Sequence, residues 1–396
     1  MAAWTALRGE SIKGLKARNW LKASESRTSK AMISALDFLS YLPRFLRERI
    51  VPNMPIPEVK NDPSKVQLIR LGHVYFEHPD LNKFAQFAKD FGFVEEKKDG
   101  NETIYFRGYG KDPYVYVATK SKTGKPRFLG PAFVARDQAE FDKAAKLPGA
   151  SVRSMDRAPG GGQQVTITRP NGTFFHVVYG QTERKIDANT GAEPTATHDS
   201  QGPFNTPFEK RRLGQFQRYH EGPALVHKVG HFGYVCKECD EELEFYTSNF
   251  NFVHSDILWH PQFSNIDVLT FMHLDLGKEW SDHHIFFMQR APPEVEETYI
   301  HHSSYEVADF DTQLIGHEWL AKKKWKPVWG VGRHILGSQI FDYWLDSSGF
   351  KIEHYADGDV VNEDTETRRE VAGPISVWGP ELPKDFGTDM TKLSFQ

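Results

Sequence analysis

Residues 227–257, which read HKVGHFGYVCKECDEELEFYTSNFNFVHSDI, give the clearest indication of the fold. An apolar run carrying Gly-His opens it, an acidic segment ending in aromatic residues follows, and a second apolar run closes it. Residues 69–108, IRLGHVYFEHPDLNKFAQFAKDFGFVEEKKDGNETIYFRG, repeat this order. Short apolar runs on either side of a polar segment of helical length are typical of strands flanking a helix. Both stretches therefore predict a strand, a helix and further strands, with His73 and His231 at equivalent places.

The stretches that follow also match in pairs. Residues 130–146 parallel residues 301–323, because each reads as a strand, an acidic helix start and a helix. Residues 167–180 parallel residues 343–358, because each reads as a strand, a tight turn with glycine and a strand. Internal repeats set the whole architecture. We therefore predict an α+β protein of four strand–helix–strands units, arranged as two domains.

The repeats also divide the chain into parts. The polar stretch between the copies contains Pro, Gly and Thr and the basic run KRRLGQFQR, which is typical of a linker. The stretch after the second copy is acidic and then carries Pro and Gly, and we expect it to cover a surface. The predicted parts are an arm at 1–65, domains at 66–183 and 224–360, a linker at 184–223 and a tail at 361–396.

The composition is that of a globular protein with packed cores. Of its 396 residues, 39% are hydrophobic and 13% aromatic, and its formal charge is −4. This near balance gives no basic footprint for nucleic acid, so we expect a small-molecule or protein partner. The two cysteines, Cys236 and Cys239, make half of a four-cysteine zinc site and no disulfide scaffold. We expect two free thiols, which fits a reducing compartment.

The N-terminus bears on location. Residues 1–30 are basic, with Glu10 and Glu25 as the only acids, and lack the apolar core of a secretory signal. An organelle transit segment is therefore left open beside a cytoplasmic location. Residues 29–52 place apolar residues at helical spacing, and we expect an arm packed on the main body rather than a membrane-surface helix. No run of 18 apolar residues occurs, so no membrane span is predicted.

Strand alternation brings three ligand-type residues to one face. Alternate residues of a strand point to the same side of a sheet. His231 lies in GHFGYVC, His302 lies in HHSSYEV with His301 on the other face, and Glu353 lies in GFKIEHY. Two imidazoles and one carboxylate leave the opposite side of an ion open, a set that suits Fe(II), Mn(II) or Zn(II). Spacing alone leaves open that these are ordinary structural residues.

The first domain offers an internal comparison. Its aligned positions are His73, Gly130 and His176. Because Gly130 has no side chain to bind an ion, we expect this copy to be metal-free.

The two copies resemble the vicinal oxygen chelate superfamily, whose domains each pair two βαβββ units. Residues 224–360 resemble, more narrowly, the catalytic domain of type I extradiol dioxygenases, which cleave catechol rings. The motifs that carry this resemblance are VGHFGYV, HHSSYEVADFD, GVGRH and YWLDSSGFKIEHY, and it spans about residues 66–360. It implies an open barrel-like sheet around a cavity in each domain. It also implies an enzyme that uses Fe(II), or alternatively Mn(II), and O₂ to open a catechol next to its diol.

The resemblance assigns roles to single residues. His231 matches the first metal ligand, His302 the second, and Glu353 the third. The usual Asp-Pro-Ser-Gly turn before the third ligand reads DSSG here, at residues 346–349, and the turn glycine is kept.

Three further residues match positions around the substrate. His284 in DHHIFFM matches a histidine near the bound O₂, His334 in GRH matches a histidine that hydrogen-bonds the substrate, and Tyr343 matches a tyrosine near the substrate hydroxyl. By alternation we expect His283, like His301, to face away from the site.

Other parts of this region are not matched to a role in the reaction. We expect His354 to be structural and Asp342 to be solvated or salt-bridged. Residues 254–271, HSDILWHPQFSNIDVLTF, have no clear counterpart and are expected to form a long aromatic loop.

Two other functions stay open. The first is a related metal enzyme, either a glyoxalase-like isomerase or a hydroxyphenylpyruvate-type dioxygenase. The second is a metal-free module that binds an aromatic ligand without catalysis. The oligomeric state is also open, and a homo-oligomer is compatible with the sequence.

Overall fold

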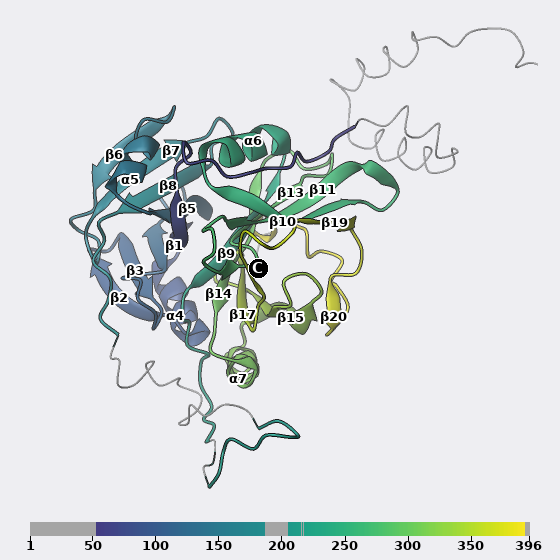
Figure 1. The fold of residues 1–396 in the computed structure, drawn as a ribbon. Coiled ribbons are helices and arrows are strands. Elements are labelled where there is room, and N and C mark those ends of the chain that lie inside the picture. The colour runs from purple at the N-terminus through teal and green to yellow at the C-terminus, as the bar shows by residue number, and fades with distance from the viewer. Residues whose placement is uncertain (1–52, 187–204, 215, 217, 393–396) are drawn as a thin grey trace, which may run out of the picture.

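The computed structural model describes residues 53–186, 205–214, 216 and 218–392. Figure 1 shows its two β-sheets side by side, the first in purple and blue and the second mainly in green. Each sheet is built from two copies of a unit in which a strand, a helix and three further strands follow one another. The predicted fold class of paired βαβββ units is therefore confirmed. The helix predicted within residues 29–52 lies outside the described residues.

The first sheet has eight strands in the order β2-β3-β4-β1-β5-β8-β7-β6. Its units are joined by their first strands, because β1 and β5 pair antiparallel at the centre. Its elements are β1 (Leu68–His78), α4 (Leu81–Phe91), β2 (Val94–Asp99), β3 (Thr103–Arg107), β4 (Tyr116–Lys120), β5 (Arg127–Ala135), α5 (Gln138–Ala144), β6 (Ala150–Ser154), β7 (Gln163–Thr168) and β8 (Phe174–Tyr179).

The second sheet has ten strands in the order β19-β10-β11-β13-β9-β14-β17-β16-β15-β20. Its units are again joined by their first strands, the antiparallel pair β9 and β14. Its elements, with the short strands β12 and β18 that pair with each other beside it, are β9 (Val229–Cys236), α6 (Cys239–Asn249), β10 (Phe252–His260), β11 (Phe263–Leu274), β12 (Ser281–Asp282), β13 (Phe286–Arg290), β14 (Tyr299–Glu306), α7 (Phe310–Lys322), β15 (Lys326–His334), β16 (Ile340–Leu345), β17 (Lys351–Ala356), β18 (Val360–Val361), β19 (Arg368–Val371) and β20 (Ser376–Trp378). A single 3₁₀ turn, η1 (Met390–Lys392), follows.

Aspartates fix where three of the helices begin. The side chain of Asp80 accepts a hydrogen bond from the backbone N–H three residues on, and Asp137 and Asp309 do the same at α5 and α7. Such caps satisfy N–H groups that have no partner inside the helix. α4 ends at Gly92, whose φ of +105° belongs to a left-handed cap that glycine adopts without strain.

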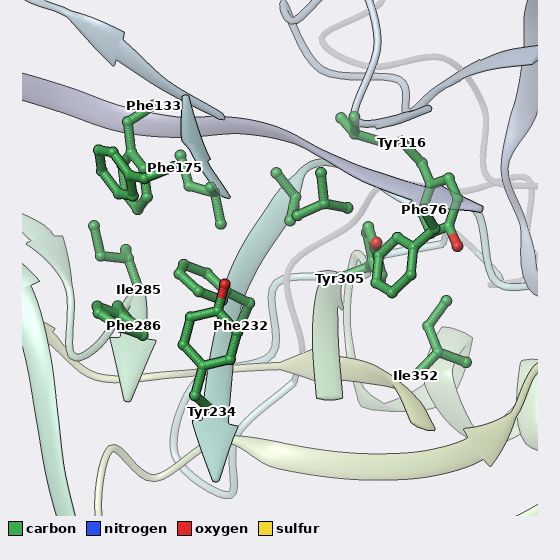
Figure 2. Close-up of a cluster of buried hydrophobic side chains, with 14 of the residues drawn as sticks. Phe76, Tyr116, Phe133, Phe175, Phe232, Tyr234, Ile285, Phe286, Tyr305 and Ile352 are labelled. Atoms are coloured by element: carbon green, nitrogen blue, oxygen red, sulfur yellow. The ribbon is translucent and has the colours of Figure 1, made fainter. Parts of the chain in front are cut away.

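The two sheets share one aromatic core, shown in Figure 2. The ring of Phe133 on β5 lies 6.2 Å from that of Phe232 on β9. Fully buried His354 has its Nε2 2.7 Å from the backbone carbonyl of Phe91 at the end of α4, so its expected structural role is confirmed. Because aromatic rings bury large areas, this packing holds the second sheet against the first.

Two segments depart from or add to the expectations. Residues 254–271 are not a loop but most of the β10–β11 hairpin, and their run of apolar residues packs as strands. The tail adds a strand to each edge of the second sheet, because β19 pairs with β10 and β20 pairs with β15.

Cys236 and Cys239 are both buried free thiols, as expected. No helix of the described part is long and apolar enough to cross a membrane.

A substitution of Asn251 tests the contact between the two sheets. It is 1% exposed, and its amide accepts from the N–H of Leu68 at 2.8 Å and donates to the carbonyls of Leu68 and Asp275 at 3.0 Å. Asn251→Leu leaves these buried groups unpaired, so we expect the free energy of unfolding to fall by about 2–4 kcal/mol in urea denaturation. The exposed turn residue Asn101 serves as control, and Asn101→Ala should change it by less than about 0.5 kcal/mol. Equal stability of the two variants would show that the hydrogen bonds of Asn251 do not stabilise the contact between the sheets.

Candidate metal centre

Three side chains from three strands of the second sheet converge in its interior. His231 comes from β9, His302 from β14 and Glu353 from β17. His231 Nε2 lies 3.0 Å from His302 Nε2 and 3.1 Å from Glu353 Oε2, and His302 Nε2 lies 3.3 Å from the same oxygen. Their exposed fractions are 2%, 5% and 0%. Within the described ranges this is the one group of three such residues placed to hold a metal.

The spacing of these atoms fits a single ion. Bonds of about 2.1 Å at right angles put neighbouring ligand atoms about 3.0 Å apart. Neither carboxylate oxygen of Glu353 accepts a hydrogen bond of good geometry, although the residue is fully buried. A buried carboxylate without partners is costly, and a bound cation would remove that cost.

The electrostatics of the group favour cation binding. Burial acts to raise the pKa of Glu353, but the adjacent imidazoles of His231 and His302 outweigh it and hold that pKa well below its usual range. Burial lowers the pKa of His302 to about 4, against an opposing effect of Glu353. At neutral pH the group therefore presents a carboxylate together with a neutral imidazole at His302, the forms that ligate metals.

Strand register explains how these residues meet, and it corrects one expectation. Ser304 on β14 lies opposite both His231 on β9 and Glu353 on β17. The ladder shifts between Ile300 and His302, so simple alternation fails there. His301 therefore does not face away from the site. It is 5% exposed, and its Nδ1 lies 2.7 Å from His302 Nδ1.

His334 and Tyr343 lie beside the carboxylate. Tyr343 is directly opposite Glu353 in the β16–β17 ladder, and His334 Nε2 lies 3.0 Å from the Tyr343 hydroxyl and 4.0 Å from Glu353 Oε1. His334 Nδ1 lies 3.0 Å from the carbonyl of Ile375, which makes Nδ1 a donor and leaves Nε2 as an acceptor for the phenol. Burial, with the nearby carboxylate adding to it, raises the pKa of Tyr343 well above its usual value.

His284 also reaches this region. It follows β12, is 4% exposed, and its ring centroid lies 4.2 Å from that of His231. Its neighbour His283 was expected to face away, but it is 3% exposed and its Nδ1 lies 3.1 Å from His284 Nδ1. Alternation does not apply at these two residues, because they lie in the turn between β12 and β13 rather than within a strand.

Asp342 takes the second of its two expected environments. It is fully buried and salt-bridged, with His317 Nδ1 at 2.9 Å and the indole N–H of Trp344 at 2.7 Å. It therefore belongs to the support of β16 rather than to the site.

The tail supplies a part of the site that the sequence did not reveal. Lys351, 4% exposed, donates to the backbone carbonyls of Phe386 and Thr388 at 2.7 Å each. The Phe386 ring lies 5.0 Å from the rings of Tyr343 and His301. The available signal was Lys351 itself, because a lysine sharing a buried strand face with Glu353 needs acceptors from elsewhere.

The first sheet shows what the same register does without a ligand set. His73 lies opposite Ala132, which lies opposite His176, as His231, Ser304 and Glu353 do in the second sheet. The equivalent interior is filled by Tyr75, whose hydroxyl lies 3.0 Å from His73 Nε2 and donates to Gln164 at 2.8 Å. Gln164 in turn contacts His176 Nδ1 at 2.7 Å. These polar groups satisfy one another.

Comparison with known sequences gives one partial match. No protein-family model matches the chain. A segment of 132 residues is 32% identical to metapyrocatechase 2 of Cupriavidus necator. The match covers 30% of this chain and 36% of that protein, so the chain aligns with about a third of the relative's length.

Solved structures match over much more of the chain. The homoprotocatechuate 2,3-dioxygenase of Brevibacterium fuscum with 3,4-dihydroxyphenylacetate has a TM-score of 0.64 at 15% identity, over 86% of this chain and 95% of that one. A 2,3-dioxygenase of Pseudomonas sp. KL28 has 0.61 at 17% identity, over 76% and 97%. The Mn(II)-bound glyoxalase of Novosphingobium aromaticivorans has 0.60 at 19% identity, over 80% and 94%. The chain therefore shares the two-domain fold of these dioxygenase and glyoxalase structures.

Proposed function

We propose that this protein is an Fe(II)-dependent extradiol dioxygenase that opens the ring of a catechol next to its diol. The observation that carries the proposal is the buried group of His231, His302 and Glu353 with the pair His334–Tyr343 directly beside it. Two nitrogens and one carboxylate would hold a metal ion and leave positions on it for a substrate diol and O₂. The match with metapyrocatechase 2 supports the same chemistry.

The proposal also includes the identity of the metal ion. The donor set has no thiolate, which favours iron, manganese or zinc over softer ions. Mn(II) stays the alternative to Fe(II), because a glyoxalase of similar fold holds Mn(II). When bound, the ion supplies the positive charge that eases loss of the catechol proton and the redox activity that O₂ chemistry needs.

The chain's own residues then handle the substrate protons. Because His334 Nδ1–H is held by the Ile375 carbonyl, its Nε2 is the lone pair that accepts a proton from a substrate hydroxyl. The Tyr343 hydroxyl, now bonded to that nitrogen, donates to the second substrate oxygen and fixes its position. His284, whose ring lies 4.2 Å from that of His231, takes part in the proton transfer that ring opening requires.

Aromatic side chains shape the space beside the pair. Trp329 and Phe341 pack on each other at 3.9 Å, and Phe341 lies 4.3 Å from the His334 ring. Phe386 of the tail lies 5.1 Å from Trp329. Flat apolar walls of this kind suit a planar aromatic ring and exclude water from it.

The first test is O₂ uptake by iron-loaded protein, prepared without air, against a panel of catechols. One O₂ consumed for each coloured ring-opened product is the expected result. Iron bound at one equivalent without uptake, together with turnover of a thiol adduct, would move the function to a glyoxalase-like isomerase. Absence of bound metal would contradict the whole proposal.

Removal of the carboxylate tests the ligand group. Glu353→Ala should weaken Fe(II) binding by about 100-fold or more, because a buried ligand is lost, and activity should fall with it. Bound iron is measured by elemental analysis after dialysis. Glu306→Ala is the matched control, since Glu306 lies on β14 beside the centre but pairs with His227 and Lys228. Full iron occupancy in Glu353→Ala would disprove the assignment.

Removal of one hydroxyl tests the substrate contact. Tyr343→Phe should keep iron and lower kcat by about 10- to 100-fold, because one oriented donor is lost while the ring packing is kept. Steady-state O₂ uptake measures it. Tyr305→Phe removes an equally buried hydroxyl, bonded to Ser303, and should leave kcat within about two-fold. Equal kcat in the two variants would remove Tyr343 from the site.

A further inference from the structure

We infer that Asp256 and His283 are positioning residues, which hold His284 in one tautomer through a chain of hydrogen bonds. This inference rests on the proposed function for its meaning in catalysis. The row of hydrogen bonds itself rests on the distances between these three side chains.

The three residues form a continuous buried line that starts beside the metal ligands. The His284 ring lies 4.2 Å from that of His231, and its Nδ1 lies 3.1 Å from His283 Nδ1. On the far side of its ring, His283 Nε2 lies 2.6 Å from Asp256 Oδ2. The exposed fractions of His284, His283 and Asp256 are 4%, 3% and 1%. Asp256 comes from β10, so the line links two separate parts of the second sheet.

The carboxylate at one end constrains the protons along the line. A carboxylate can only accept, so His283 Nε2 carries a hydrogen and donates it to Asp256. In the arrangement that we infer, this is the one hydrogen on the His283 ring, so His283 Nδ1 accepts from His284 Nδ1–H. His284 Nε2 is thereby left unprotonated. A histidine whose second nitrogen is held in this way is fixed in orientation, as in the serine protease triad.

The surroundings hold this line in place. Arg368 of β19 pairs with the other oxygen of Asp256, with its Nε at 3.0 Å from Oδ1. A side chain at Gly337 would place its first carbon 2.7 Å from His283 Nδ1, and Gly337 has φ of +72°. The turn over His283 therefore needs glycine, which keeps that face of the imidazole clear.

A buried Asp–His pair can also serve stability alone, and the experiment must separate the two roles. Asp256→Asn and His283→Leu interrupt the line at different places. His273→Gln is the matched control, because His273 is also 3% exposed and bonded to Ser255 at 2.7 Å, but it is not a member of the line.

Steady-state kinetics of the iron-loaded variants is the first readout. We expect kcat to fall by about 10- to 100-fold in Asp256→Asn and His283→Leu, with iron content and the KM for catechol within about two-fold of wild type. His273→Gln should keep kcat within about two-fold. An unchanged kcat in both line variants, or an equal loss in the control, would overturn the inference.

The second readout does not depend on turnover. Nitrogen-15 spectra of histidine-labelled, zinc-loaded protein report which nitrogen of each ring carries hydrogen, and His284→Gln identifies the signals. We expect hydrogen on Nδ1 of His284 and on Nε2 of His283, and a changed or mixed His284 tautomer in Asp256→Asn. The opposite tautomer of His284 in wild type would overturn the inference. A wild type that opens no catechol but shows the expected tautomers would refute the proposed function and leave the line intact.

Discussion

A carboxylate with no exposed surface and no well-placed hydrogen-bond donor lies at the centre of the second sheet, and the rest of the site is arranged around it. Burying Glu353 uncompensated would be strongly unfavourable. The two imidazole nitrogens within 3.3 Å of the carboxylate offset part of this cost. A divalent cation would remove the rest of this cost, with the same three side chains as its ligands.

The two sheets show how little separates a ligand site from a packed core. In the first sheet the pair Tyr75 and Gly130 occupies the ladder position that Gly233 and His302 occupy in the second. The large side chain thus comes from the first strand in one copy and from its partner strand in the other. Tyr75 fills the interior and bonds to His73, whereas at Gly233 the Phe287 ring occupies the space that a side chain would take. The two interiors are therefore lined differently at this one ladder position.

Much of this arrangement could be predicted from the sequence, because it depends on period-two alternation and on a repeat. The four units, the Gly-His openings of two of them and the shared face of His231, His302 and Glu353 all follow from local patterns. The predictions that failed concern the orientation of single side chains. A ladder shift after Ile300 turns His301 inward, and His283 lies in a turn where alternation gives no guidance. The tail's contacts could not be predicted, because they depend on long-range pairing that no local pattern records.

The tail nevertheless follows from the same constraint as the centre. Lys351 shares a buried strand with Glu353, and burial lowers its pKa to about 8, which shows how unfavourable its charge is there. Its ammonium needs acceptors that the sheet cannot provide, because the strand's own carbonyls are used in the ladder. The carbonyls of Phe386 and Thr388 supply them. Satisfying this cation draws Phe386 onto the rings of Tyr343 and His301, so a polar requirement of β17 also closes an apolar wall over the site.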